Sequence, residues 1–235
     1  MNPPSEIPVE LRNVFGSCSD GTAINDVSAT FAAGKLHILR GMPESGKAAL
    51  FRFAGLLEEP AGGEVLIEGR SARGLAEQAR TELRTQRMGF AFAAPFLLGS
   101  FSVIENVAMP LFKISHVGPE EARRRTEAML AFVGLSGAAE RRVDELVPSA
   151  QYHVAVARGL VNDPAVLMVE NLDGTLTGIE LEQYLTVLRN AAAALGPAII
   201  ATASPALKVL DGDRVLDIHQ GAIARDSEFL PEAHE

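Results

Sequence analysis

A short glycine-rich segment has the residue types and the spacing of an anion-binding loop. Gly41 and Gly46 are separated by four residues, Lys47 follows directly, and the apolar run Leu36–Leu39 precedes them. In a G-x-x-x-x-G-K segment, backbone amides and the lysine surround a phosphate group, and the following helix adds its positive N-terminus. The sequence therefore predicts a phosphate site here. The alternative is a glycine turn closed by a solvated lysine.

Two residues of this segment conflict with a working site. The expected nucleotide-binding residues are Gly41, Met42, Pro43, Glu44, Ser45, Gly46, Lys47, Ala48 and Ala49. Ala48 stands where a serine or threonine oxygen would hold Mg²⁺, which places Mg²⁺ binding in doubt. Glu44 is expected to put a carboxylate where phosphate oxygens would lie, or to pair with Lys47. The loop is therefore predicted to be recognisable but chemically impaired.

The composition limits the kind of molecule that carries this loop. The chain has 235 residues, 47% of them hydrophobic, and a net charge of -9. This length fits one large domain with a buried core, and the acidic balance argues against nucleic-acid binding. Cys18 is the only cysteine, and none of histidines 37, 116, 153, 219 and 234 has metal-ligand spacing, so no metal site is predicted. No apolar run is long enough to span a bilayer, and we expect a soluble cytoplasmic protein.

Strand-like apolar runs alternate with helical patterns, and these elements must position the loop. The predicted strands are 9–14, 27–31, 36–39, 64–67, 88–92, 166–169, 198–202 and 214–218. Helices are predicted after Lys47 and over 76–86, 103–111, 120–133, 151–160 and 179–194. Several runs are apolar on both faces, as in a parallel sheet covered by helices. The pattern predicts an α/β core with a helical insertion and hairpin-like strands near the N-terminus.

Three signals predict where helices begin. Ser102 and Glu105 have the spacing of a capping box, and Pro119 suits a first helical turn. Ser149 is expected to cap the helix that begins near Gln151.

Two further segments identify a family by the order of their residues. Residues 88–111 read MGFAFAAPFLLGSFSVIENVAMPL, and residues 154–164 read VAVARGLVNDP. Together with the loop they make the chain similar, over nearly its whole length, to the nucleotide-binding subunit of an ABC transporter. The sequence of 88–111 is most similar to the lipoprotein-release, macrolide-export and FtsE-like branch. The resemblance implies one domain over 1–235: a P-loop NTPase (RecA-like) core with an N-terminal antiparallel β subdomain and a helical subdomain inserted at 93–158.

The residues that this resemblance would make catalytic are replaced. The Q-loop glutamine falls on Ala93, the Walker B aspartate on Glu170, and the glutamate that polarises water on Asn171. The D-loop aspartate falls on Thr177 and the switch histidine on Ala203. The signature sequence falls on Leu146, Val147, Pro148, Ser149 and Ala150. The adenine-stacking aromatic falls on Cys18, with Phe15 as the alternative.

These replacements predict a subunit that has lost ATP hydrolysis, because metal ligand, base and switch residue are missing together. The resemblance implies a cytoplasmic scaffold or regulatory subunit on the inner membrane, docked on a permease through 93–112. It also implies a homodimer, or a heterodimer with another ABC ATPase subunit, and ATP bound weakly or not at all. One alternative is a transporter subunit with weak or atypical hydrolysis that uses Glu170. Another is an ATP/ADP-sensing module that acts through Lys47. A P-loop kinase or GTPase would leave 88–111 and 146–177 unexplained.

Overall fold

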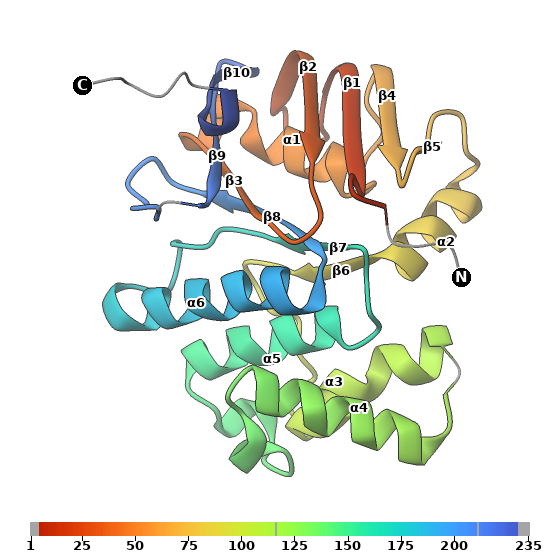
Figure 1. The fold of residues 1–235 in the computed structure, drawn as a ribbon, viewed down its shortest axis with the longest axis vertical. Coiled ribbons are helices and arrows are strands. Elements are labelled where there is room, and N and C mark those ends of the chain that lie inside the picture. The colour runs from red at the N-terminus through yellow and green to blue at the C-terminus, as the bar shows by residue number, and fades with distance from the viewer. Residues whose placement is uncertain (1–4, 116, 211, 230–235) are drawn as a thin grey trace.

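Two β-sheets and two layers of helices make up the chain (Figure 1). A computed structural model describes residues 5–115, 117–210 and 212–229, so His116 and His234 lie outside the described residues. In Figure 1 the smaller sheet lies at the top, the larger sheet runs from β10 at the upper left to β6 in the middle, and most helices lie below it. Within the described ranges, no helix is both long enough and apolar enough to cross a lipid bilayer.

The smaller sheet is antiparallel and has the strand order β2-β1-β4-β5. Its strands are β1 (Val9–Ser17), β2 (Ala23–Phe31), β4 (Gly62–Ile67) and β5 (Arg70–Ser71). Val9 pairs with Phe31 on one side and with Ile67 on the other, and all three side chains are buried. This sheet confirms the antiparallel strands expected near the N-terminus. The sequence missed β5, which is two exposed residues long.

The larger sheet has six strands in the order β10-β9-β3-β8-β7-β6. They are β3 (Leu36–Arg40), β6 (Met88–Ala91), β7 (Val166–Val169), β8 (Ala198–Ala203), β9 (Arg214–His219) and β10 (Ala222–Asp226). All pairs are parallel except β9 with β10. The predicted α/β core is confirmed. The sequence missed β10 because its residues are not buried and form no apolar run.

Helices cover both faces of the larger sheet (Figure 1). They are α1 (Lys47–Ala54), α2 (Glu77–Arg87), α3 (Val103–Pro110), α4 (Pro119–Phe132), α5 (Pro148–Leu160) and α6 (Gly178–Leu195). A π-helical turn, Leu111–Ser115, continues α3. Leu50 and Phe53 of α1 are buried between the two sheets with Val9 and Ile200. A second apolar cluster joins the opposite face of the larger sheet to α3, α4, α5 and α6.

The helix starts confirm two of the three predicted signals. Ser102 and Glu105 form the reciprocal capping box of α3, and Pro119 occupies the first turn of α4. The cap predicted at Ser149 is wrong, because α5 begins at Pro148 with Val147 as its N-cap. Proline suits the first helical position since its φ is already helical and its missing N–H is not needed there.

Helix α5 lies very close to strand β6 where two glycines face each other. A Cβ atom added at Gly89 would lie 2.0 Å from the carbonyl oxygen of Gly159. Real contacts of that length do not occur, so the distance between helix and strand depends on Gly89. The same strand leads into the segment that carries Ala93.

Candidate functional site

Several of the predicted site residues lie at one edge of the larger sheet. Parallel strands end on the same side, and the loops that follow them lie together there. Gly41 follows β3, and its amide donates to the carbonyl oxygen of Ala203 at the end of β8, 3.3 Å away. Glu170 follows β7 and accepts a hydrogen bond from the amide of Ala93, which follows β6, at 3.2 Å. We call this side of the sheet the carboxyl edge.

The phosphate-loop segment has the backbone shape that anion binding requires. Gly46 has φ +97°, and a Cβ atom there would lie 2.4 Å from the carbonyl oxygen of Ala23, so only glycine fits. The amide of Leu50 donates to the carbonyl of Gly46 at 3.0 Å, which starts α1. The amides of Ala48 and Ala49 belong to the first turn, where backbone donors have no acceptor within the helix. The residues fit a phosphate group.

The side chains of the loop differ from the expected arrangement. The Lys47 ammonium donates to the carbonyl oxygen of Gly41, and Glu44 is exposed. The expected pairing of Glu44 with Lys47 is therefore wrong, because the lysine reaches back across the loop to a backbone oxygen. The expectation that the Glu44 carboxylate is enclosed in the loop is also wrong, because Glu44 is exposed to solvent. Burial lowers the pKa of Lys47, and the nearby Asp173 carboxylate opposes that shift.

Two acidic side chains at the carboxyl edge are engaged with backbone donors of neighbouring segments. Glu170 accepts from Ala93, as described above. Asp173 accepts from the backbone amide of Ser204 at 2.9 Å and also from its hydroxyl. Sequence reasoning missed Asp173 and Ser204. The available signals were an acid four residues after a buried strand and a serine directly after the next strand.

Asn171 and Ala203 occupy the positions expected for a base and a switch residue. Asn171 has φ +59°, which asparagine tolerates. Its backbone N–H donates to Oγ1 of Thr202 at 2.8 Å. A carboxamide cannot accept a proton at neutral pH. Ala203 is fully buried and carries no polar group. Ala48 provides no side-chain ligand for a metal, and neither Asn171 nor Ala203 provides a base.

Tyr152 connects three segments around this edge. Its hydroxyl donates to the carbonyl oxygen of Ala93 at 2.8 Å and lies 2.9 Å from Oγ1 of Thr175. Tyr152 belongs to α5, Ala93 follows β6, and Thr175 follows β7. The helical layer is thus hydrogen-bonded to two loops of the sheet. Sequence reasoning missed this residue.

We expect Tyr152→Phe to lower the free energy of unfolding by about 1 kcal/mol, because it removes a partly buried hydrogen bond. Hydrogen exchange should become faster in residues 93–101. Thr175→Val is the control, since it removes the second contact and leaves the bond to Ala93. Unchanged exchange in 93–101 for Tyr152→Phe would contradict this role.

The remaining predicted positions lie at the starts of α5 and α6 and in or directly after β1. Val147 is the N-cap of α5, and Leu146, Pro148, Ser149 and Ala150 flank it. Thr177 is the N-cap of α6. Cys18 is buried, so it presents no surface on which an adenine ring could stack. Burial also raises the pKa of its thiol. Phe15, the alternative, is half-exposed.

An aromatic row extends from β6 into the loop that follows it. The rings of Phe90 and Phe92 are stacked with centroids 5.3 Å apart, and Phe96 meets Phe92 edge-on at 5.9 Å. Arg158 donates to the carbonyl oxygens of Pro95 and Phe96 at 2.7 and 2.9 Å. Phe96 itself has φ +48° and is 71% exposed. The Arg158 hydrogen bonds thus hold a strained turn that presents an aromatic ring to solvent.

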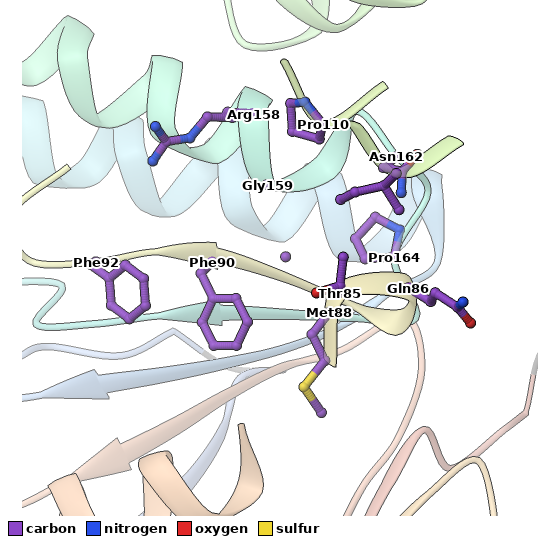
Figure 2. A pocket seen from close by; sticks show the side chains of 12 residues that line it. Thr85, Gln86, Met88, Phe90, Phe92, Pro110, Arg158, Gly159, Asn162 and Pro164 are labelled. Atoms are coloured by element: carbon purple, nitrogen blue, oxygen red, sulfur yellow. The ribbon is translucent and has the colours of Figure 1, made fainter. Parts of the chain in front are cut away.

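A cavity of about 210 Å³ lies beside this row (Figure 2). It is lined by Phe90 of β6, by Phe92 just after that strand, by Pro110 at the end of α3, and by Arg158 and Gly159 of α5. Figure 2 shows the two phenylalanines side by side and Arg158 on the helix opposite. Of the residues that line the cavity only Pro110 falls within 93–112, the range that also contains the exposed ring of Phe96.

Comparisons with known proteins agree with this architecture. The family model described as ABC transporter matches residues 24–172. The lipoprotein-releasing system ATP-binding protein LolD of Paramagnetospirillum magneticum is 36% identical over 218 residues, covering 91% of this chain and 94% of the relative. LolD of Chromohalobacter salexigens is 34% identical and covers 88% and 87%. A solved structure, the dimeric post-hydrolysis state of the ATP-binding cassette MJ0796 bound to ADP and Pi, has a TM-score of 0.79 at 25% identity and covers 93% and 97%.

Proposed function

Since the chain belongs to the ABC transporter family and has the fold of its ATP-binding subunits, we propose that it is a subunit that has lost ATP hydrolysis and serves a membrane permease complex as a scaffold or regulator. The observation that carries the proposal is the set of side chains at the carboxyl edge. Ala48 offers no side-chain oxygen to Mg²⁺, Asn171 offers no carboxylate to an attacking water, and Ala203 offers no imidazole.

The size of the expected defect follows from these losses. Removing a general base commonly costs about 10²–10⁴-fold in rate. Phosphoryl transfer also depends on a held metal and on donors placed around the γ-phosphate, so the losses compound. We therefore expect turnover below detection.

The residues fit a phosphate group better than they fit Mg²⁺. Gly46 and the first turn of α1 retain an anion cradle, while Lys47 is drawn toward Gly41. The acids that could replace the missing metal ligand, Glu170 and Asp173, accept hydrogen bonds from Ala93 and Ser204. We propose that Gly41–Ala49 contacts nucleotide weakly, without Mg²⁺, or not at all.

The proposed domain division is one ABC-type ATPase domain over 1–235, with 93–158 as its helical subdomain. Helices α3, α4 and α5 fall within or across this range, and their apolar cluster packs on the larger sheet, which supports the division.

The proposed partner is an integral membrane permease that docks around 93–112, at the cytoplasmic face of the inner membrane. Exposed Phe96, Phe101 and Phe112 and the adjacent cavity support this, since aromatic side chains beside a hollow suit a partner's side chains. The relatives are named as proteins of a lipoprotein-releasing system. Pairing with a second ATPase subunit, the same or different, is supported by the dimeric solved relative.

A subunit with weak or atypical hydrolysis is the second candidate, and the comparisons favour it. The relatives are named as ATP-binding proteins, and the solved relative is described in a post-hydrolysis state. Lys47 and Glu170 supply this chain with the lysine and one acid that such a reaction could use.

Turnover assays of the purified protein and of its membrane complex separate the candidates. We expect no ATP hydrolysis above that of Lys47→Ala, with Lys35→Ala as a control for loss of a lysine outside the loop. Turnover that Lys47→Ala abolishes would overturn the loss of hydrolysis. Activity gained by Asn171→Glu with Ala48→Ser would support the second candidate, because it would show that the other groups work. Calorimetric titration with ATP or ADP, with and without Mg²⁺, tests the nucleotide-sensing module. That candidate requires heat of nucleotide binding without ATP turnover.

A further inference from the structure

Two adjoining hollows lie at the edge of the larger sheet opposite the carboxyl edge. The first measures about 440 Å³ and lies between α4, the segment after α5 and the end of α6. The second also measures about 440 Å³, and Ala165 and Pro197, which directly precede β7 and β8, line it. Because Asp163 and Leu195 line both hollows, the two form one groove, which we call the amino-edge groove.

Apolar side chains line the amino-edge groove in both hollows. Leu195 stands where the hollows meet and is 47% exposed. The larger apolar lining residues elsewhere are Met129, Phe132 and Val161 in the first hollow and Pro8, Pro164 and Pro197 in the second. Apolar hollows of about 300–1,000 Å³ that contain a few polar groups are typical of small-molecule sites.

Two arginines line the α4 end of the groove and are held in place by one acid. Arg124 donates to the Glu121 carboxylate through Nε and Nη2, both at 2.8 Å, and Arg125 donates to it through Nε at 2.7 Å. Within the described part of the chain, Nη1 of Arg124 and Nη2 of Arg125 make no hydrogen bond. Each guanidinium group is therefore oriented and still has a donor for an anion.

The acids of the groove determine where an anion fits. Asp163 accepts from Nη1 of Arg125 at 3.3 Å, and its side chain is 81% exposed, so a ligand carboxylate can take its place. The second hollow is lined by Glu6 and Glu68, and its one arginine, Arg87, is already bound by Glu68. An anionic group is therefore favoured at the α4 end and disfavoured at the other.

We propose that the amino-edge groove binds a fatty acid, with the carboxylate at Arg124 and Arg125 and the aliphatic chain over Leu195 toward Pro197. Guanidinium and carboxylate groups form strong, charge-assisted hydrogen bonds. The apolar lining favours an aliphatic chain, since each methylene group removed from water adds to the affinity. Binding at this edge involves neither nucleotide nor the phosphate loop, so it goes beyond the proposed function and is independent of it.

Calorimetric titration of the full chain with dodecanoate, below the concentration at which it forms micelles, tests the proposal. We expect dodecanoate to bind at least about tenfold more tightly than dodecan-1-ol, because the alcohol lacks the charge that the arginines recognise. Hexanoate should bind at least about tenfold more weakly than dodecanoate, because it buries fewer methylene groups.

Two substitutions with matched controls locate the carboxylate. Arg125→Gln should weaken dodecanoate binding about tenfold. Arg123→Gln is its control, because this neighbouring arginine pairs with Glu127 and Glu140 and does not line the groove. Asp163→Asn should instead strengthen binding about threefold, since it removes the competing carboxylate. Asparagine also tolerates the φ of +51° at that position.

A third substitution locates the aliphatic chain. Leu195→Glu should abolish dodecanoate binding, because it puts a carboxylate where the two hollows meet. Ile179→Glu is the matched control, since it adds the same charge to an exposed apolar residue at the other end of α6. Unfolding curves of the variants that match the wild type exclude misfolding as the cause.

Three results would overturn the proposal: no heat of binding with dodecanoate, equal affinity for dodecan-1-ol, or equal affinities of Arg125→Gln and Arg123→Gln for dodecanoate. Flotation with phosphatidylglycerol vesicles, without binding of monomeric dodecanoate, would also overturn it, because the arginines would then serve a membrane surface. The titrations contain no nucleotide, so their failure leaves the proposed loss of hydrolysis unaffected, whereas ATP turnover contradicts only that loss.

Discussion

Gly89→Ala should lower the free energy of unfolding by about 3 kcal/mol, the upper range for forcing extra atoms into a packed core. The added Cβ would lie 2.0 Å from the backbone oxygen of Gly159. A backbone atom within a helix cannot move aside independently, whereas the end of a flexible side chain can. Relief requires α5 to move off β6. That movement would also shift Arg158, which holds the turn before Phe96.

Two other glycines provide the controls for this prediction. A Cβ at Gly159 would meet the end of the flexible Leu167 side chain at 2.7 Å, so Gly159→Ala should cost less than Gly89→Ala. A Cβ at Gly137 meets nothing within 4 Å, and Gly137→Ala should change stability by less than about 0.5 kcal/mol. Urea unfolding followed by circular dichroism measures all three. If Gly89→Ala and Gly137→Ala lower the free energy of unfolding equally, the close approach of β6 to α5 at Gly89 does not contribute to stability.

Acidification is expected to destabilise the fold through His37, the second residue of β3. The side chain is fully buried, its ring meets Phe31 edge-on at 5.3 Å, and Nε2 lies 3.0 Å from the carbonyl oxygen of Ala32. Burial lowers its pKa from 6.5 to about 4. Arg214 and Lys35 lower the pKa further, whereas Glu228 and the hydrogen bond to Ala32 raise it.

The direction of the effect follows from which state binds the proton. Between about pH 6.5 and pH 4 the unfolded chain protonates this histidine and the folded chain does not. Stability from His37 is therefore complete above pH 6.5 and decreases as the pH falls toward 4, by up to about 3 kcal/mol.

The measurement is the free energy of urea unfolding against pH for the wild type and His37→Gln, whose side chain retains a donor for Ala32. Other carboxylates titrate equally in both proteins, so the difference between the two curves isolates His37. That difference should shrink or reverse as the pH falls. Parallel curves would show that His37 protonates equally in the folded and unfolded states.

The parts of the site that the sequence could predict depend on local patterns. The strand before the phosphate loop, the glycine at the left-handed position and the buried strand over 166–169 follow from neighbouring residues. That Ala48, Asn171 and Ala203 carry no hydroxyl, carboxylate or imidazole was likewise readable from the sequence, whereas the roles expected at these positions follow from the family resemblance.

The side-chain partners were not predictable, because each depends on segments that only the fold brings together. Tyr152 and Ala93 are 59 residues apart, and Asp173 and Ser204 are 31 apart. The same limit explains the wrong pairing of Glu44 with Lys47. Charge and proximity in the chain suggested that pair, whereas a backbone oxygen brought close by the loop receives the lysine.

The hydrogen bonds of Tyr152 have a mechanical consequence. They join the helical layer to two loops of the sheet, so a displacement of α5 is passed directly to the segments that carry Ala93 and Thr175. Under the proposed docking on a permease through 93–112, motion of the partner would reach the carboxyl edge of the sheet through this side chain.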